Sequence, residues 1–170
     1  MQQVSTMAGI EQHDFGELLQ SHRAIVFKVA NTYCRHPDDR ADIAQEIAAQ
    51  LWSAWPGYDP ARRFSTWMYR IALNVAISFV RSDSRRRQRM QALDETLHDM
   101  ADENAFDHEA DQHLGLLQAF IDRQSPLDRA LLLLYMEERS GREIAEILGI
   151  SEANVSTKIG RLKQRIRDDI

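Results

Sequence analysis

The chain has 170 residues and a formal net charge of −5 at pH 7, and 44% of its residues are hydrophobic and 28% charged. This composition is typical of a soluble globular protein of one or two small domains and excludes wholesale disorder. No apolar run reaches the roughly 20 residues that span a bilayer, the N-terminus lacks a signal-peptide pattern, and the single cysteine excludes an internal disulfide framework. We therefore expect a cytoplasmic protein without membrane insertion.

The first half of the chain shows three helical patterns in succession. Apolar spacing predicts a helix over residues 15–33 and a second helix that starts near a cluster of aspartates and ends at Pro56. After a loop, Ser65 is the predicted N-cap of a third helix that ends near Arg81. These three helices form one compact domain, to which we assign residues 15–89.

The composition changes twice after this domain. A basic run of five arginines is followed by residues 92–113, which carry eight carboxylates and no lysine or arginine. An acidic stretch with few large apolar residues is typical of a linker or an interaction tail. We therefore assign residues 90–113 to an acidic linker and residues 1–14 to an N-terminal tail.

Residues 114–170 form a second small helical domain. Helical periodicity resumes at Leu114, and Ser125 followed by proline predicts the start of a helix over residues 127–138, with a buried run of leucines. The fold class predicted for the whole chain is therefore all-α, with two small helical domains joined by the acidic linker.

The last thirty-one residues have the pattern of a helix-turn-helix. Ser140 and Glu143 form a capping box ahead of a short amphipathic helix, which Gly149 ends in the left-handed conformation. Ser151 then caps a second helix. The small Ala145 and the spacing of these residues are typical of the DNA-binding motif.

The second helix of this pair carries five cations between Val155 and Arg167 and no carboxylate, although the chain is acidic. Local positive charge in an acidic protein indicates a polyanionic partner. The alternative is a helical hairpin with a solvated basic face. On the DNA-binding interpretation, the candidate contacts on this helix are Asn154, Ser156, Thr157, Lys158, Arg161, Lys163 and Arg165.

Motifs in both domains resemble those of extracytoplasmic-function (ECF) sigma factors. In the first domain the resemblance rests on the segments 42–46 (DIAQE), 51–55 (LWSAW), 58–60 (YDP) and 64–74 (FSTWMYRIALN). In the second it rests on residues 143–151 (EIAEILGIS) together with Val155 and Arg161. Many regulators share a helix-turn-helix, but its pairing with the first domain at this distance is specific.

The resemblance implies a sigma factor that binds core RNA polymerase, reads the −35 promoter element with the second domain and opens the −10 element with the first. It implies that Asp42, Gln45 and Glu46 dock on the clamp helices of the β′ subunit. The −35 contacts would be the seven residues of the basic helix. The residues implied at the melted −10 strand are Tyr58, Arg62, Arg63, Phe64, Arg70 and Asn74.

The resemblance also implies partners and a mode of regulation. An anti-sigma factor would hold the protein inactive, and the acidic linker would either thread into polymerase channels or act as a flexible tether. We expect no cofactor, no metal site and no enzymatic activity, since no nucleophile and base pair or phosphate loop is evident and the polymerase supplies the chemistry. Two alternatives remain: a stand-alone helix-turn-helix regulator, or a helical adaptor that does not bind DNA.

Two residues outside these motifs have an open interpretation. Cys34 and His36 could form part of a metal site or sense redox state, or they could simply pack at a helix end and in its exit loop. The linker histidines (His98, His108 and His113) are spaced irregularly. This spacing disfavours a metal site.

Overall fold

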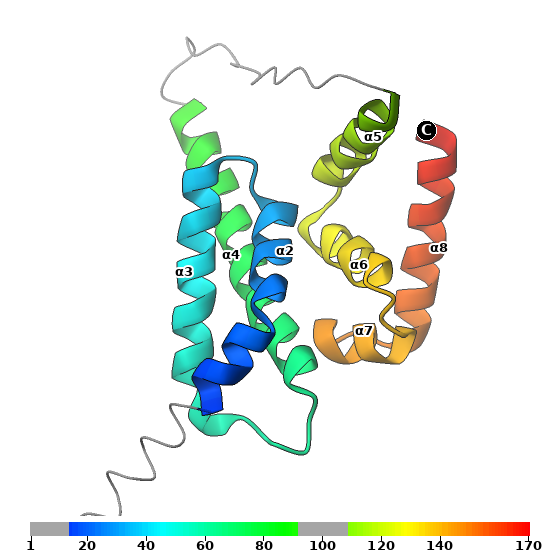
Figure 1. The fold of residues 1–170 in the computed structure, drawn as a ribbon. Coiled ribbons are helices and arrows are strands. Elements are labelled where there is room, and N and C mark those ends of the chain that lie inside the picture. The colour runs from blue at the N-terminus through cyan, green and yellow to red at the C-terminus, as the bar shows by residue number, and fades with distance from the viewer. Residues whose placement is uncertain (1–13, 92–108) are drawn as a thin grey trace, which may run out of the picture.

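The computed structural model describes residues 14–91 and 109–170, and its regular elements in these ranges are all helical (Figure 1). A helical segment over residues 14–21 precedes α2 (Arg23–Tyr33), α3 (Pro37–Ala54), the short 3-10 helix η1 (Trp55–Gly57) and α4 (Phe64–Gln91). The second half contains α5 (Glu109–Arg123), α6 (Pro126–Met136), α7 (Gly141–Leu148) and α8 (Glu152–Asp169). The predicted all-α class is confirmed. None of these described helices is both long and apolar enough to cross a membrane.

The continuous helix predicted over residues 15–33 is wrong, because the chain breaks at His22. The backbone of His22 leaves the helical region (φ −110°, ψ 13°), and its ring nitrogen Nδ1 lies 2.9 Å from the Leu18 carbonyl oxygen. The His22 ring also packs against Phe64, with ring centroids 4.9 Å apart. The break thus lies at a residue with a tertiary contact, which the apolar spacing alone does not reveal.

The third predicted helix, α4, differs from its prediction at both ends. It begins at Phe64, because the Arg63 carbonyl already accepts a helical bond from the Trp67 amide at 3.2 Å. Ser65 is thus inside the first turn, and its hydroxyl accepts from Arg139 instead of capping. The helix also runs through the arginine-rich segment to Gln91 rather than ending near Arg81.

The predicted capping residues of the second domain are confirmed. Ser125, Ser140 and Ser151 each accept a hydrogen bond from the amide three residues later, at 3.2, 3.1 and 3.1 Å. Gly149 ends α7 in the left-handed conformation, with φ 68°. The helix predicted over residues 127–138 is α6, which starts at Pro126 and stops at Met136, and its four consecutive leucines are buried.

Two glycines give a stability prediction of opposite sign. Alanine at Gly149 meets no neighbouring atom but must adopt φ 68°, so Gly149→Ala is expected to lower the free energy of unfolding by about 1 kcal/mol. Gly160 lies inside α8, also with free space around it. Gly160→Ala is therefore expected to raise the free energy of unfolding by about 1 kcal/mol. Urea denaturation of both variants beside the wild type measures both shifts, and a loss of stability in Gly160→Ala would contradict the account of α8.

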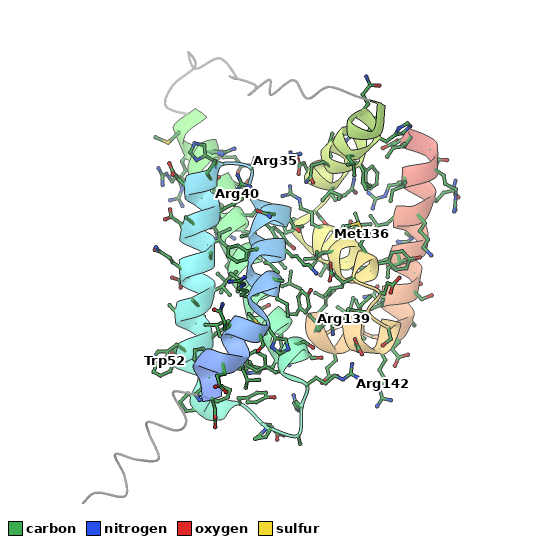
Figure 2. All side chains as sticks on the ribbon, in the orientation of Figure 1. Arg35, Arg40, Trp52, Met136, Arg139 and Arg142 are labelled. Carbon is green, nitrogen blue, oxygen red and sulfur yellow. The ribbon has the colours of Figure 1, made fainter. Side chains whose placement is uncertain are left out.

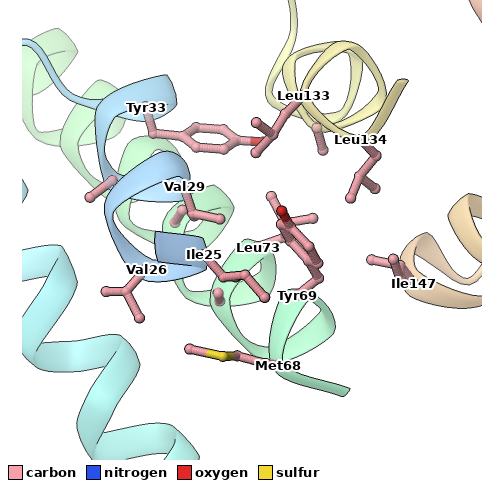
Figure 3. Packing of buried hydrophobic residues seen from close by; sticks show 14 of the residues in the cluster. Ile25, Val26, Val29, Tyr33, Met68, Tyr69, Leu73, Leu133, Leu134 and Ile147 are labelled. Atoms are coloured by element: carbon pink, nitrogen blue, oxygen red, sulfur yellow. The ribbon is translucent and has the colours of Figure 1, made fainter. Parts of the chain in front are cut away.

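The two domains pack against each other and share one hydrophobic core. α2 and α4 contact α5, α6 and α7, and Figure 3 shows Tyr33, Leu133 and Leu134 meeting where α2, α4 and α6 converge, with Tyr69 facing Ile147. All five side chains are buried. The Tyr33 hydroxyl donates to the Pro126 carbonyl at 2.6 Å, and burial raises the pKa of this phenol. Residues 1–13 of the predicted tail and residues 92–108 of the predicted linker lie outside the described residues. The linker predicted over residues 90–113 overlaps both flanking helices, because α4 continues to Gln91 and α5 begins at Glu109.

Candidate polymerase and nucleic-acid interfaces

The three acidic and amide candidates for polymerase binding lie on one exposed face of α3. Ile43 and Ile47 are fully buried against α2 and α4, which turns Asp42, Gln45 and Glu46 toward solvent. Positions three and four residues apart are neighbours on a helix surface. The helix α3 lies on the far side of the molecule from α5 to α8, with α2 and α4 between them (Figure 1). A basic partner can therefore reach it directly.

A cluster of aromatic rings supports the loop ahead of α4. The Trp55 and Tyr58 rings are stacked, with centroids 5.3 Å apart and planes at 16°, and Phe64 and Trp67 pack against them. Phe64 is only 7% exposed, so it shapes the loop from inside. Trp67 contacts the rings of Trp55, Tyr58 and Phe64 and is thus part of this packed cluster. The Tyr58 hydroxyl donates to the Arg62 carbonyl at 2.7 Å, which closes the loop.

Three of the polar −10 candidates are exposed without a partner among the described residues of the second domain, and the fourth, Arg63, is paired with that domain. Arg70 and Asn74 are exposed one turn apart on α4, and Asn74 lines a hollow that Glu46 and Gln50 of α3 share. Arg62 is exposed in the loop. Arg63, in contrast, pairs with Glu143 of the second domain at 3.0 Å. The structure therefore places Asn74 beside Glu46, whereas Arg63 is paired with the second domain.

The basic helix α8 has one buried side and one exposed side. Val155 and Leu162 are buried against the rest of the domain. The remaining side of the helix exposes Asn154, Ser156, Thr157 and Arg161, and Lys158 is half-buried.

Two of the cations in the second half of α8 have partners on α6. The Lys163 ammonium lies 4.5 Å from the Tyr135 ring centroid, and Arg165 donates to Asp128 at 3.3 Å. The first half of α8 is therefore the part best placed to read base edges.

Two interface residues were not predicted to act between domains. Arg139 was assigned no role, and Glu143 was expected only in the capping box. Their partners are 74 and 80 positions away in the sequence, so that local spacing carries no signal for them.

Cys34 is a buried helix-end residue. It is 8% exposed, and burial raises the pKa of its thiol to about 11, with the carboxylates of Asp39 and Asp83 adding to the shift. His36 caps α3 by accepting from the Asp38 amide at 3.2 Å. Residues 14–91 and 109–170 contain no group of three or more His, Cys, Asp or Glu side chains arranged to hold a metal ion. The packing interpretation of Cys34 fits this environment, since a thiol with a raised pKa is a poor nucleophile and metal ligand.

Two family patterns match the chain. The pattern described as Sigma-70 region 2 matches residues 18–86, and the pattern described as Sigma-70, region 4 matches residues 114–166. Together they cover more than two thirds of the sequence. The ECF RNA polymerase sigma factor SigE of Mycolicibacterium smegmatis is 31% identical over 156 residues, which are 89% of this chain and 60% of that protein. The chain belongs to the ECF family of sigma factors.

Solved structures share the fold of this ECF sigma factor. The structure of CnrH in complex with the cytosolic domain of CnrY matches with a TM-score of 0.64 and 22% identity, over 94% of this chain and 91% of that one. The sigma factor RpoE of Bartonella quintana, crystallised with the anti-sigma factor NepR, matches with a TM-score of 0.62 and 16% identity, over 92% and 94% of the two chains. Both likenesses extend over the two domains.

Proposed function

We propose that the protein binds core RNA polymerase, recognises −35 and −10 promoter elements and opens the −10 duplex to start transcription. One observation carries this proposal: a single chain exposes an acidic face on α3, within the region 2 match, and an uncovered recognition helix, within the region 4 match. The protein acts in the cytoplasm, where the polymerase is. It makes no covalent bond itself, because the polymerase provides the catalytic centre.

In this proposal, the exposed groups of the two domains have different binding roles. Asp42, Gln45 and Glu46 meet basic side chains on the clamp helices of the β′ subunit, where electrostatic complementarity favours docking. The front of α8 enters the major groove at the −35 element. Near the hollow beside Asn74, a melted −10 base finds an amide that can donate and accept, and Arg62 and Arg70 neutralise phosphates.

The two structural relatives were solved in complexes, one with an anti-sigma factor by name. We extend this to the present chain: an anti-sigma factor covers the α3 face or the front of α8 and so keeps it from polymerase or promoter. The seven −35 and six −10 candidates remain proposals at the level of individual residues. Among the −35 candidates, Lys163 and Arg165 contribute through charge, since both already have partners on α6.

Strand opening gives a direct test of the −10 assignment. Core polymerase and the purified chain are mixed with a duplex promoter that carries a fluorescent adenine analogue in the −10 element, and the rise in fluorescence reports unstacking. Asn74→Ala is expected to lower the opened fraction about tenfold, the effect of losing contacts to one base. Asn31→Ala, an exposed amide on α2, is the matched control and is expected to open the promoter like wild type. Equal opening by Asn74→Ala and wild type would remove Asn74 from the site.

A further inference from the structure

The first described helical turns of the chain lie against the loop that joins α3 to α4 (Figure 1). We call residues 14–22 the N-terminal segment and residues 55–64 the −10 loop. We propose, on the basis of the proposed function of this loop, that the N-terminal segment is a positioning element of the −10 site. Through the rings of Phe15 and His22 it holds the two ends of the −10 loop in the conformation that binds the melted strand.

At the start of the −10 loop, the Phe15 ring packs against two tryptophans. Its centroid lies 5.2 Å from that of Trp52, near the end of α3, and 5.2 Å from that of Trp55, the first residue of the loop. Figure 2 shows Trp52 at the end of α3 that leads into the loop. Phe15 is 5% exposed, so one buried ring joins the N-terminal segment to both α3 and the −10 loop.

At the other end of the −10 loop, the His22 ring packs against Phe64 with centroids 4.9 Å apart. Phe64 is the first residue of α4 and is buried. The imidazole is itself held in place, because its Nδ1 lies 2.9 Å from the Leu18 carbonyl oxygen. Rings at the two ends of the N-terminal segment therefore contact rings at the two ends of the −10 loop.

Further ring contacts connect both ends of the −10 loop to Tyr58, a candidate for the melted −10 strand. The Tyr58 ring is stacked on Trp55 at 5.3 Å, and its centroid is 5.7 Å from that of Phe64. Its hydroxyl donates to the carbonyl of Arg62, another −10 candidate, at 2.7 Å. Aromatic pairs at such separations favour particular relative orientations of their rings. A displaced ring at either end of the loop therefore shifts Tyr58 and the Arg62 backbone.

Open space beside the −10 loop gives these end contacts their importance. A hollow of about 790 Å³ separates the N-terminal segment from the middle of the loop, where Trp55, Tyr58 and Pro60 line it. Hydrogen bonds inside the loop, such as that from the Arg62 amide to the Asp59 carbonyl at 3.0 Å, fix a local turn but not the position of the loop on the domain. A loop that borders such a space can shift unless its ends are held.

The N-terminal segment lies apart from the groups proposed for the other two binding steps. Trp52, its contact on α3, comes six positions after Glu46, which is about 9 Å along the helix. The −35 candidates are on α8, which packs on α6 and α7. Changes at Phe15 and His22 are therefore expected to affect the −10 step alone.

Binding of a single-stranded −10 oligonucleotide to core polymerase loaded with the full-length chain tests this inference. Phe15→Leu keeps an apolar side chain at the buried site but removes both ring contacts, and it is expected to weaken binding about fivefold, the scale of a lost aromatic pair. His22→Ala removes the contact at the other end and is expected to have a similar effect. Affinities for core polymerase and for a −35 duplex are expected to stay within about twofold of wild type.

Matched variants separate positioning of the loop from general damage to the domain. Phe27→Leu makes the same change at an exposed phenylalanine of α2 and is expected to bind the oligonucleotide like wild type. His22→Phe keeps a ring against Phe64 but loses the bond to the Leu18 carbonyl, and it is expected to restore the binding lost in His22→Ala. Urea denaturation checks that each variant is folded under the conditions of the binding assay.

A double variant shows whether Phe15 acts through the −10 loop. Once Tyr58→Leu has removed the ring that Phe15 positions, adding Phe15→Leu is expected to cause no further loss of oligonucleotide binding. Coupled residues lose less together than the sum of their separate losses, whereas independent residues give additive losses.

The possible results distinguish the positioning role from the proposed function. Wild-type oligonucleotide binding by Phe15→Leu and His22→Ala, additive losses in the double variant, or an equal loss of polymerase affinity would each overturn the positioning role while leaving the proposed function standing. If polymerase loaded with the wild-type chain binds the −10 strand no better than a strand of scrambled sequence, the proposed function of the loop is overturned and the positioning role with it.

Discussion

Replacement of both Asp42 and Glu46 by arginine is expected to weaken binding of core RNA polymerase about 100-fold or more. Both carboxylates are exposed one turn apart on α3, so the double change replaces two attractive charges by two repulsive ones on the face proposed to meet a basic partner. A 100-fold loss corresponds to about 2.7 kcal/mol, within the range for removal or reversal of interfacial charge pairs. Fluorescence anisotropy of a labelled chain titrated with core polymerase measures the dissociation constant.

The control for this variant makes a similar charge change in the other domain. Glu146 is exposed on α7 and has no part in the proposed contacts of α3, so Glu146→Arg is expected to bind polymerase within about twofold of wild type, as surface substitutions away from an interface do. Because the Asp42, Glu46 and Glu146 side chains are all exposed, both variants should unfold at the wild-type urea midpoint. Equal affinity of the double variant and the control would place the docking surface elsewhere.

Arg161→Ala is expected to lower affinity for the preferred −35 duplex by about 1–3 kcal/mol, which is roughly 5-fold to 150-fold, and to relax the preference at one base pair. Arg161 is exposed on the side of α8 that also presents Asn154 and Thr157. A guanidinium there can make two hydrogen bonds to guanine in the major groove. Binding of polymerase loaded with the variant to duplexes that differ at each −35 position measures the change.

Arg165→Ala distinguishes the electrostatic contribution to DNA binding from the recognition of individual bases. Because Arg165 donates to Asp128 on α6, its loss is expected to weaken binding to all −35 sequences to a similar extent and to reduce the dependence on salt concentration. A sequence-dependent loss of DNA affinity in Arg165→Ala would contradict these roles. So would a loss in Arg161→Ala that is equal for all −35 sequences.

Local patterns in the sequence predict the parts of this fold that local forces determine. Ser125, Ser140 and Ser151 cap helices because their hydroxyls bond to amides three residues away, and Gly149 ends α7 because its position needs a positive φ. Such features depend on a few neighbouring residues. They can therefore be predicted from spacing and residue type.

Long-range contacts account for what the sequence did not predict. His22, at the break before α2, packs against Phe64, and the Ser65 hydroxyl accepts from Arg139. The partners of Lys163 and Arg165 lie on α6, more than 25 residues away. No periodicity within one helix encodes these pairs.

Run-off transcription with purified core polymerase on a pool of promoters tests the central claim most directly. The wild-type chain is expected to start discrete transcripts from one promoter class. The Asp42→Arg, Glu46→Arg double variant is expected to yield none because polymerase does not retain it, and Arg161→Ala is expected to lose transcripts through the −35 element while still binding polymerase. A wild-type chain that neither binds core polymerase nor starts transcripts would contradict the account and favour a stand-alone regulator or an adaptor.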